Sequence, residues 1–483
     1  MSTSGRTAAP ARQGRWIEHW EPEDPAFWEA TGKRVARRNL AFSIFTEHIG
    51  FSVWSLWSVM VLFMTPAQGF TLDASDKFLL VSFATLVGAV IRVPYTLAVP
   101  RFGGRNWTIV SAAALLVPTV LTAIFMQRPE TSFATFMVLA AVTGIGGGNF
   151  ASSMANISFF YPDRQKGWAL GLNAAGGNLG VPAVQLVGLF VIAFFGQANP
   201  AYVAMFYLPL LIVAVTGAAL YMDNLATARS DVAAQLAVVR DRHAWVMSFL
   251  YIGTFGSFIG YGFAFGLVLQ TQFGFTPLAA ASLTFIGPLL GSLSRPVGGW
   301  LADRRGGARV TLWIFIGMAL ATAGIIAAAP SESLPVFLVG FIALFVLSGL
   351  GNGSTYKMIP AIFAAQARSQ VEAGADPGEA GRTARRLAAA LIGIAGAIGA
   401  LGGVFINVAF RFSFGSSGTG TAAFVAFLAF YAVCAGLTWR VYLHRPTAAR
   451  TGPTPPGPTP PGAVPTSTGP TSTGAARPVL DGV

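Results

Sequence analysis

Twelve long apolar stretches recur along this chain, and they constrain its fold more than any other feature of the sequence. A helix needs about 20 residues to cross a bilayer, and each stretch is long enough to do so. With 54% hydrophobic and 10% charged residues, the chain is predicted to be an all-α membrane protein with twelve transmembrane helices. The stretches lie near 41–64, 78–100, 106–127, 133–160, 168–195, 201–221, 244–271, 277–302, 309–329, 334–358, 387–410 and 420–442.

Polar segments divide these stretches into regions. The N-terminal arm holds three tryptophans and a basic cluster, so we expect an interfacial helix in it. The tail is rich in Pro, Thr and Gly and is expected to be disordered. The predicted regions are a cytoplasmic arm (1–40), a six-helix half (41–221), a cytoplasmic linker (222–243), a second six-helix half (244–442) and a cytoplasmic tail (443–483).

Lysines and arginines concentrate in alternate loops and in both termini. The opposite loops hold only Lys77, Arg128 and Arg411. Since positively charged flanks stay in the cytoplasm, both termini are predicted to be cytoplasmic. The net charge of +12 follows this loop pattern and not a basic face on a soluble module, so no nucleic-acid partner is indicated. The single cysteine, Cys434, excludes an intrachain disulfide and a thiolate metal site.

The two halves repeat each other. An offset of 203 residues aligns unusual residues in the first part of each half, and an offset of 222 aligns glycines further along. Two parallel repeats related by an axis along the membrane normal are the arrangement of major facilitator transporters, with substrate bound between the repeats. The aligned pairs are Gly88/Gly291, Arg92/Arg295, Arg101/Arg304, Gly148/Gly351, Asn149/Asn352, Gly177/Gly399 and Gly180/Gly402.

Arg92 and Arg295 are embedded in the predicted membrane region. Each lies nine residues before a loop arginine, or about 13 Å along a helix. A buried charge costs about 3 kcal/mol or more and usually faces a pathway or a partner. A structural ion pair is the alternative, but Glu47 is the one clearly embedded carboxylate, so one positive charge is left over. The planar fork of arginine suits a small oxyanion.

Glu47 lies nine residues after Arg38, level with both arginines. Burial disfavours the charged form of a carboxylate, so Glu47 is the candidate proton carrier. The alternative is a static partner for an arginine. His48 could share the proton-carrying role, although successive residues point in different directions on a helix.

Two motifs stand out, GGGNFASSMANISFFYPDRQKGWALGLNAAGGNLGV and GNGSTYKMIPAIF. They resemble the nitrate signatures of the nitrate/nitrite porter family, NarK type, within the major facilitator superfamily. GWLADRRGGAR also resembles the cytoplasmic signature of the superfamily. The resemblance covers the arm and all twelve stretches, but not the tail.

This resemblance implies nitrate held between Arg92 and Arg295. It further implies that Tyr261 hydrogen-bonds the anion, that Phe150 and Phe265 sandwich it, and that Asn178 contributes to the site. Ordinary packing is the alternative for the two phenylalanines, and a bond to a neighbouring carbonyl is the alternative for the tyrosine.

A further group of small and amide residues is open between gating and helix packing, because amides can bond across helices and glycines allow close, movable contact. Lys357 near the end of its helix is expected to snorkel. The gating or packing candidates are Asn149, Asn173, Gly176, Gly177, Gly180, Gly351 and Asn352.

The resulting prediction is a secondary transporter that imports nitrate across the cytoplasmic membrane by nitrate/proton symport. Nitrite is a possible second substrate, and neither a required protein partner nor a cofactor is indicated. No phosphate-cradling loop is present, and no metal motif or nucleophile arrangement indicates an enzyme. The alternatives are a nitrate/nitrite antiporter without proton coupling and a nitrate receptor that does not transport.

Overall fold

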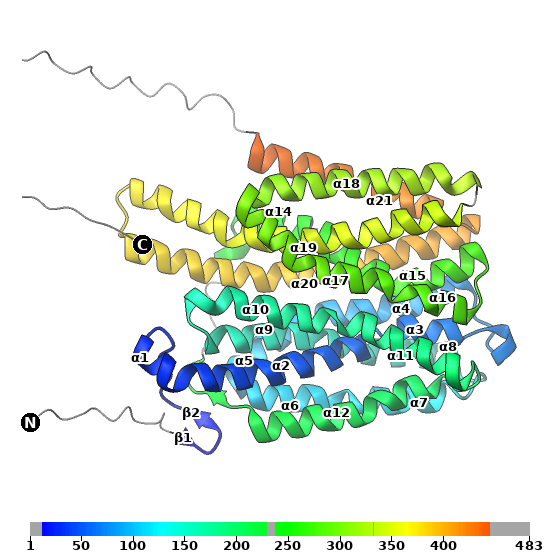
Figure 1. Ribbon diagram of the computed structural model, residues 1–483, viewed down its shortest axis with the longest axis horizontal. Coiled ribbons are helices and arrows are strands. Elements are labelled where there is room, and N and C mark those ends of the chain that lie inside the picture. The colour runs from blue at the N-terminus through cyan, green and yellow to red at the C-terminus, as the bar shows by residue number, and fades with distance from the viewer. Residues whose placement is uncertain (1–11, 229–236, 332, 445–483) are drawn as a thin grey trace, which may run out of the picture. The chain divides into compact units, whose positions relative to one another are not determined.

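The chain forms a bundle of helices that run along one common direction (Figure 1). The structure is a computed structural model, and it describes residues 12–228, 237–331 and 333–444. Within these ranges, eleven helices are long and apolar enough to cross a membrane. Their elements are α4 (Ala74–Val90) with α5 (Arg92–Phe102), α6 (Gly104–Ala114) with α7 (Leu116–Phe125), α8 (Phe133–Thr143) with α9 (Asn149–Phe160), α10 (Asp163–Asn178) with α11 (Gly180–Phe195), α12 (Ala201–Tyr221), α14 (Arg242–Tyr251) with α15 (Ser257–Phe273), α16 (Pro277–Thr284) with α17 (Ile286–Arg305), α18 (Gly307–Ala328), α19 (Leu334–Glu372), α20 (Pro377–Ser417) and α21 (Thr421–Thr438).

The first predicted stretch, 41–64, forms two helices, α2 (Lys33–Trp54) and α3 (Trp57–Phe63). The break falls at Ser55, whose hydroxyl donates to the Phe51 carbonyl at 2.6 Å. Serine bonds of this kind bend helices. The eleven candidate spans confirm the prediction of an all-α membrane bundle, and α2 with α3 occupies the position of the predicted first span.

Proline explains four other interruptions. In each case the irregular residue lies three positions before a proline, and the helix before it ends four positions before that proline. Proline has no N–H to donate to the carbonyl of the residue four positions earlier, and its ring clashes with that carbonyl. The helix therefore bends there. The pairs of break and proline are Ile91/Pro94, Leu115/Pro118, Leu179/Pro182 and Phe285/Pro288.

The helices α19 and α20 are much longer than the predicted stretches 334–358 and 387–410. They contain 39 and 41 residues, or about 58 and 62 Å at 1.5 Å per residue. A hydrocarbon core is only about 30 Å thick. Their joined ends therefore reach outside the membrane as a helical hairpin, which projects past the other helices in Figure 1.

The N-terminal arm packs against the protein. Trp20 and Trp28 are buried. The ring centroid of Trp20 lies 5.4 Å from that of Phe160, and the ring centroid of Trp28 lies 5.5 Å from that of Tyr161. These rings face protein, and the expectation of an interfacial helix in the arm stays a prediction. The described part of the arm contains short strands and, from Pro25 onward, a continuous helical segment made of α1 (Pro25–Phe27), the π-helical turn η1 (Trp28–Gly32) and the start of α2.

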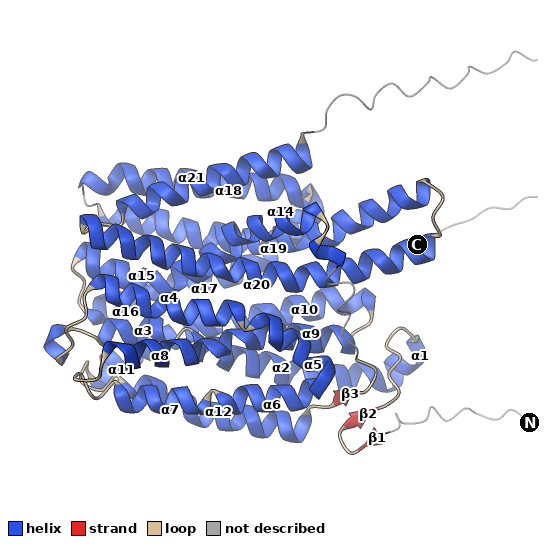
Figure 2. Cartoon of the chain, turned by 180° about the vertical axis from the view of Figure 1, so that it is seen from behind, coloured by secondary structure: helices blue, strands red, loops and turns tan. Residues whose placement is uncertain are grey.

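A small sheet joins the arm to the linker. The strand β2 (Trp16–Ile17) pairs antiparallel with β1 (Arg12–Gln13) and parallel with β3 (Asn224–Leu225), which follows α12 (Figure 2). Beside it, the buried Asp223 accepts hydrogen bonds from Arg38 and Asn39. The first residues of the predicted linker are thus fixed to the arm and to α2.

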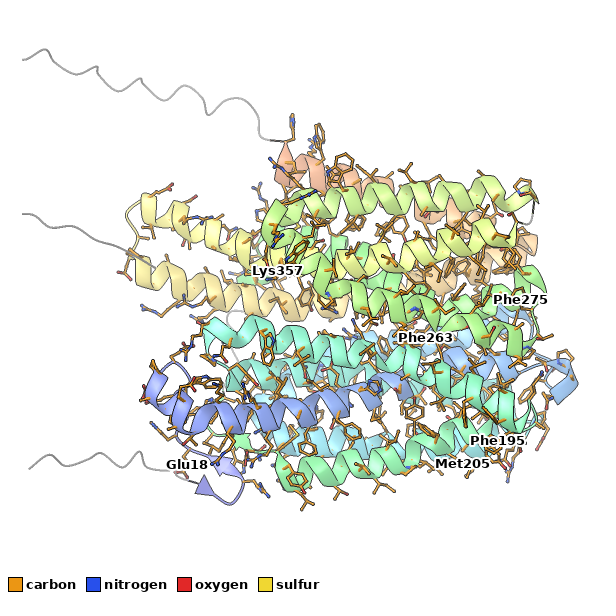
Figure 3. All side chains as sticks on the ribbon, in the orientation of Figure 1. Glu18, Phe195, Met205, Phe263, Phe275 and Lys357 are labelled. Atoms are coloured by element: carbon orange, nitrogen blue, oxygen red, sulfur yellow. The ribbon has the colours of Figure 1, made fainter. Side chains whose placement is uncertain are left out.

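The two predicted halves touch at both ends of the bundle. At the end that carries the arm, the arm end, Arg385 pairs with Asp163 at 3.2 Å. At the opposite, far end, Arg411 donates to the Ser75 hydroxyl at 3.1 Å. Between them, the ring of Phe263, labelled in Figure 3, contacts Trp54 at 5.4 Å. The division into halves stays a prediction.

Candidate functional site

Arg92 begins α5 directly after the break at Ile91 and is 1% exposed. Aromatic rings surround its guanidinium carbon, with centroids at 4.8 Å for Phe150, 5.0 Å for Phe255 and 5.4 Å for Trp54. Nη1 donates to the Gly396 carbonyl of α20 at 3.1 Å. Nη2 is buried and has no hydrogen-bond partner in the described ranges. Arg92 therefore keeps an unused donor inside an aromatic enclosure.

Arg295 lies on α17 and is 7% exposed. Its guanidinium carbon is 5.2 Å from the ring centroid of Tyr356, and that ring is 4.8 Å from the ring of Tyr251. Its Nη1 is also buried without a hydrogen-bond partner among the described residues. Both arginines are within electrostatic range of each other and of these two tyrosines. Two cations with unused donors, one from α5 and one from α17, thus lie in one region.

Glu47 lies on α2 near both arginines and is 1% exposed. Its Oε2 accepts from Asn173 Nδ2 at 2.6 Å, and the same amide nitrogen reaches the Ser153 hydroxyl at 2.7 Å. Its Oε1 is buried without a hydrogen-bond partner in the part of the chain that the structure describes. Among those residues Glu47 makes no ion pair within 4.0 Å, so it acts on the arginines through space.

A glycine face that runs from α10 into the start of α11 makes room for this carboxylate. A Cβ on Gly177 would collide with the carboxylate of Glu47, and one on Gly180 would collide with the carbonyl oxygen of His48. Gly176 lies against Ile44 in the same way, and its carbonyl is 3.0 Å from His48 Nδ1. The motif glycines therefore let α10 approach α2 at the level of the acid.

The second half repeats this contact with a different residue. A Cβ on Gly399 would collide with the ring of Tyr251, and one on Gly402 would meet the Ile252 carbonyl at 2.8 Å. Gly399 aligns with Gly177 at the offset of 222. Tyr251 also lies nine residues after Arg242, as Glu47 does after Arg38. Tyr251 is therefore the counterpart of Glu47 in the second half.

The buried asparagines behave differently from one another. Asn173 bonds across helices, as the packing alternative expects. Asn149, Asn178 and Asn352 are buried, and their amide atoms have no hydrogen-bond partner in the described ranges. The glycine before Asn352, Gly351, lies against Thr254, so α19 approaches the π-helical turn η4 (Ile252–Gly256) closely.

Tyr261 and Phe265 are not brought to the arginines. The hydroxyl of Tyr261 bonds the hydroxyl of Tyr431, and the ring of Phe265 stacks on Phe341 at 4.6 Å. Tyr261 lies ten residues beyond Tyr251, or about 15 Å along the helix.

Tyr251 and Phe255 lie at the arginines instead, and sequence reasoning missed both. The spacing of nine residues from the loop arginine would have found Tyr251, and Phe255 follows one turn later. Phe255 also lies in η4, and π-helical turns are frequent at functional sites.

Lys357, labelled in Figure 3, has an ion-pair partner. Its Nζ is 2.8 Å from a carboxylate oxygen of Asp303, and both side chains are about half exposed. The lysine thus reaches the surface, as snorkelling expects, and it meets the acidic residue of the GWLADRRGGAR motif there.

Residues 40–376 match the Major Facilitator Superfamily. The nitrate/nitrite transporter NarU of Escherichia coli (strain K12) is 42% identical over 449 residues, which cover 89% of this chain and 96% of that protein. The probable nitrate/nitrite antiporter NarK2 of Thermus thermophilus is 32% identical over 90% of this chain and 98% of that protein.

Two solved structures have a fold similar to that of this chain, and the likeness extends to the fold alone. A bacterial homologue of the human lysosomal transporter Spinster, in an inward-facing and unoccupied conformation, has a TM-score of 0.59 at 15% identity and covers 84% of this chain and 97% of that one. The D-xylose-proton symporter has a TM-score of 0.56 at 16% identity, over 86% of this chain and 98% of that one.

Proposed function

The chain belongs to the Major Facilitator Superfamily, within its nitrate/nitrite porter family, and we propose that it carries nitrate, and nitrite as a second substrate, across the cytoplasmic membrane. The observation that carries this proposal is the pair of buried arginines from the two halves. Each keeps a donor nitrogen without a partner among the described residues. A planar oxyanion between them would use these donors and offset two buried positive charges.

The proposed site consists of the two arginines with aromatic walls. Phe150 and Phe255 flank Arg92, and their rings lie 6.1 Å apart with an angle of 28° between their planes. Tyr251 stands on the Arg295 side and offers a hydroxyl, so we propose that it takes the role that the family resemblance implied for Tyr261. Asn178 remains a candidate because its buried amide has no partner in the described ranges.

We propose that transport is coupled to protons and directed inward. Glu47 supports proton coupling, because it is a buried carboxylate within electrostatic range of both arginines. Exchange of nitrate for nitrite without protons is the second candidate. The name of the Thermus relative, which describes an antiporter, favours it.

The proposed topology places both termini and the arm end in the cytoplasm, with halves 41–221 and 244–442 rocking about the site. The basic loops support this orientation. The proposed motion is supported by the contacts between the halves, which are present at both ends of the bundle and must alternate during transport.

Purified protein in liposomes tests the function. With nitrate outside and no internal anion, an imposed inward proton gradient should drive nitrate accumulation, and nitrite should compete with it. Uptake that needs internal nitrite and ignores the pH gradient would establish the antiporter. Nitrate binding without any flux would establish the receptor and would contradict both forms of transport.

A further inference from the structure

A carrier that returns across the membrane without substrate faces an electrostatic problem. Arg92 and Arg295 are both buried, and the Nη1 of Arg92 reaches across the halves to the Gly396 carbonyl. Without an anion, closing the halves brings two cations together in a medium of low dielectric constant, where their repulsion is strong. An exchanger changes conformation only with an anion bound. A symporter must return without an anion in every cycle.

We propose that the carboxylate of Glu47 takes the place of the anion in the empty carrier, and that protonation of Glu47 returns the site to the substrate. This inference rests on the proposed function and assigns the means by which the carrier returns empty. The ionised carboxylate offsets one of the two arginine charges in the absence of nitrate. When nitrate binds, it supplies that negative charge, and a proton neutralises Glu47.

The charges balance in the two states that must cross the membrane. The empty site with ionised Glu47 and the nitrate-loaded site with protonated Glu47 both carry a net charge of +1. The empty site with protonated Glu47 carries +2 and closes least readily. One proton therefore enters and leaves with each nitrate at this site, bound to and released from one carboxylate oxygen.

The groups around Glu47 fit this role. Two cations, Arg92 of α5 and Arg295 of α17, act on it through space, and Tyr356 of α19 lies within the same electrostatic range. Asn173 of α10 holds Oε2, and Ser153 of α9 hydrogen-bonds to both that amide and the Glu47 carboxylate. On α2 itself, His48 points away to the Gly176 carbonyl.

The geometry also leaves the proton a position. Oε1 has no hydrogen-bond partner among the described residues, and no ion pair within 4.0 Å locks the carboxylate there. A carboxylate held by a close arginine would stay ionised through the cycle. Glu47 is near enough to the two arginines to offset their charge, and it can lose its own charge by taking up a proton.

The internal repeat indicates that this device is present once. The equivalent position against Gly399 in the second half is Tyr251, a phenol, which stays neutral at physiological pH. One half therefore supplies the exchangeable negative charge, and the other half supplies a neutral hydroxyl.

Glu47→Gln tests the proposal in liposomes, because glutamine keeps the shape but is neutral throughout. Net nitrate uptake driven by a pH gradient should fall about tenfold or more, since the empty return loses its compensating charge. Exchange of internal nitrate for external ¹⁵N-nitrate should continue at close to the wild-type rate, because the loaded site is neutral at Glu47 in both proteins.

Gly177→Ala gives a second variant that keeps the acid and displaces its carboxylate. It should also reduce net uptake more than exchange. Gly393→Ala on α20 is the matched control, because a Cβ there meets nothing within 4 Å. If Glu47→Gln does not fold, the Gly177→Ala result decides by the same criterion.

The outcomes separate this inference from the proposed function. Net uptake by Glu47→Gln at the wild-type rate overturns the inference and leaves nitrate transport intact. Loss of exchange and nitrate binding in folded Glu47→Gln also overturns it, because Glu47 would then be needed to build the anion site. Absence of any nitrate flux in the wild-type protein contradicts the proposed function itself.

Discussion

Two arginine side chains dominate the site at the scale of single residues, and their geometry differs. Arg92 is enclosed by aromatic rings and shares one donor with a carbonyl, whereas Arg295 faces a single tyrosine ring. An anion between them would receive donors from both halves. Lysine carries a point charge and lacks the planar fork of arginine. Replacement of either arginine by lysine should therefore weaken nitrate binding.

Arg92→Lys and Arg295→Lys are therefore predicted to weaken nitrate binding about tenfold or more, through the loss of a charged hydrogen bond worth about 1.5–3 kcal/mol. Isothermal titration of the detergent-purified protein measures the change. Arg101→Lys, outside the site, is the control and should bind as the wild type does. Near-normal affinity in both site variants would remove the arginines from the site.

Tyr251→Phe is predicted to weaken nitrate binding about tenfold or more, because the anion loses a hydrogen bond to a charged group, worth about 1.5–3 kcal/mol. Tyr261→Phe is the matched control on the same helix. It removes a hydroxyl bonded to Tyr431 and should lower thermal stability without changing nitrate affinity. The opposite ranking of the two variants would restore Tyr261 to the site.

The sequence was sufficient for residues whose chemistry is rare in a membrane. Arg92, Arg295 and Glu47 stand out because buried charges are costly, and the structure brings all three within electrostatic range. Aromatic residues carry no such signal. Tyr251 and Tyr261 are each followed by a phenylalanine four positions later, so local spacing does not distinguish them, and only depth along the helix does.

Helix elements approach one another through glycine at the two equivalent places where α10 meets α2 and α20 meets α14. Gly177 and Gly399 occupy these crossings. Because it has no side chain, each glycine lets a functional side chain of the facing helix lie close to the glycine's own backbone. Substitution there acts on the side chain opposite and not on the glycine's own helix.

Gly399→Ala is predicted to weaken nitrate binding about tenfold, because its Cβ would displace the Tyr251 ring, and overpacking costs about 1–3 kcal/mol. Gly393→Ala, on the same helix, has open space and should bind normally. Equilibrium nitrate titration compares the two variants. Equal affinities would mean that α20 and α14 can separate at no cost to the site.

Element boundaries were predictable in part. Hydropathy located the spans because the bilayer sets their length, and proline positions match four of the bends. Hydropathy could not locate the ends of α19 and α20. Beyond the membrane these helices continue through polar residues such as Gln366 and Arg382, which are good helix formers but are not apolar.

At the scale of the whole molecule, the halves are connected differently at the two ends. The far end joins them through the Arg411 bond and stacked aromatic rings, Phe78 on Phe410 and Phe414. The described contacts at the arm end include the exposed Arg385–Asp163 ion pair. Exposed pairs contribute about 0–1 kcal/mol, so this contact can break readily.

Arg385→Asp is predicted to slow nitrate transport about twofold to fivefold, because repulsion from Asp163 raises the free energy of closure at the arm end. The double variant Asp163→Arg/Arg385→Asp should recover most of the rate. Lys166→Ala is the control, since Lys166 contacts Asp163 within one half at 2.9 Å. Transport rates in liposomes measure all three, and no recovery in the double variant would contradict a contact between the halves.

The whole-molecule arrangement was partly visible in the repeat. The offset of 222 anticipates the matching contacts of Gly177 and Gly399, because the two predicted halves pack their helices at equivalent places. The folded arm was not predictable, since its strands are two residues long and pair with a segment near residue 224. Sequence periodicity carries no information about so short and distant a pairing.

That pairing has a consequence for the order in which the protein is made. The strand β2 at residues 16–17 finds its parallel partner at residues 224–225, so it waits until all of the first half has been synthesised. Contacts so distant in sequence form late. Asp223, bonded to Arg38 and Asn39, emerges at the same moment. The arm can therefore close only after the first six helices have been synthesised.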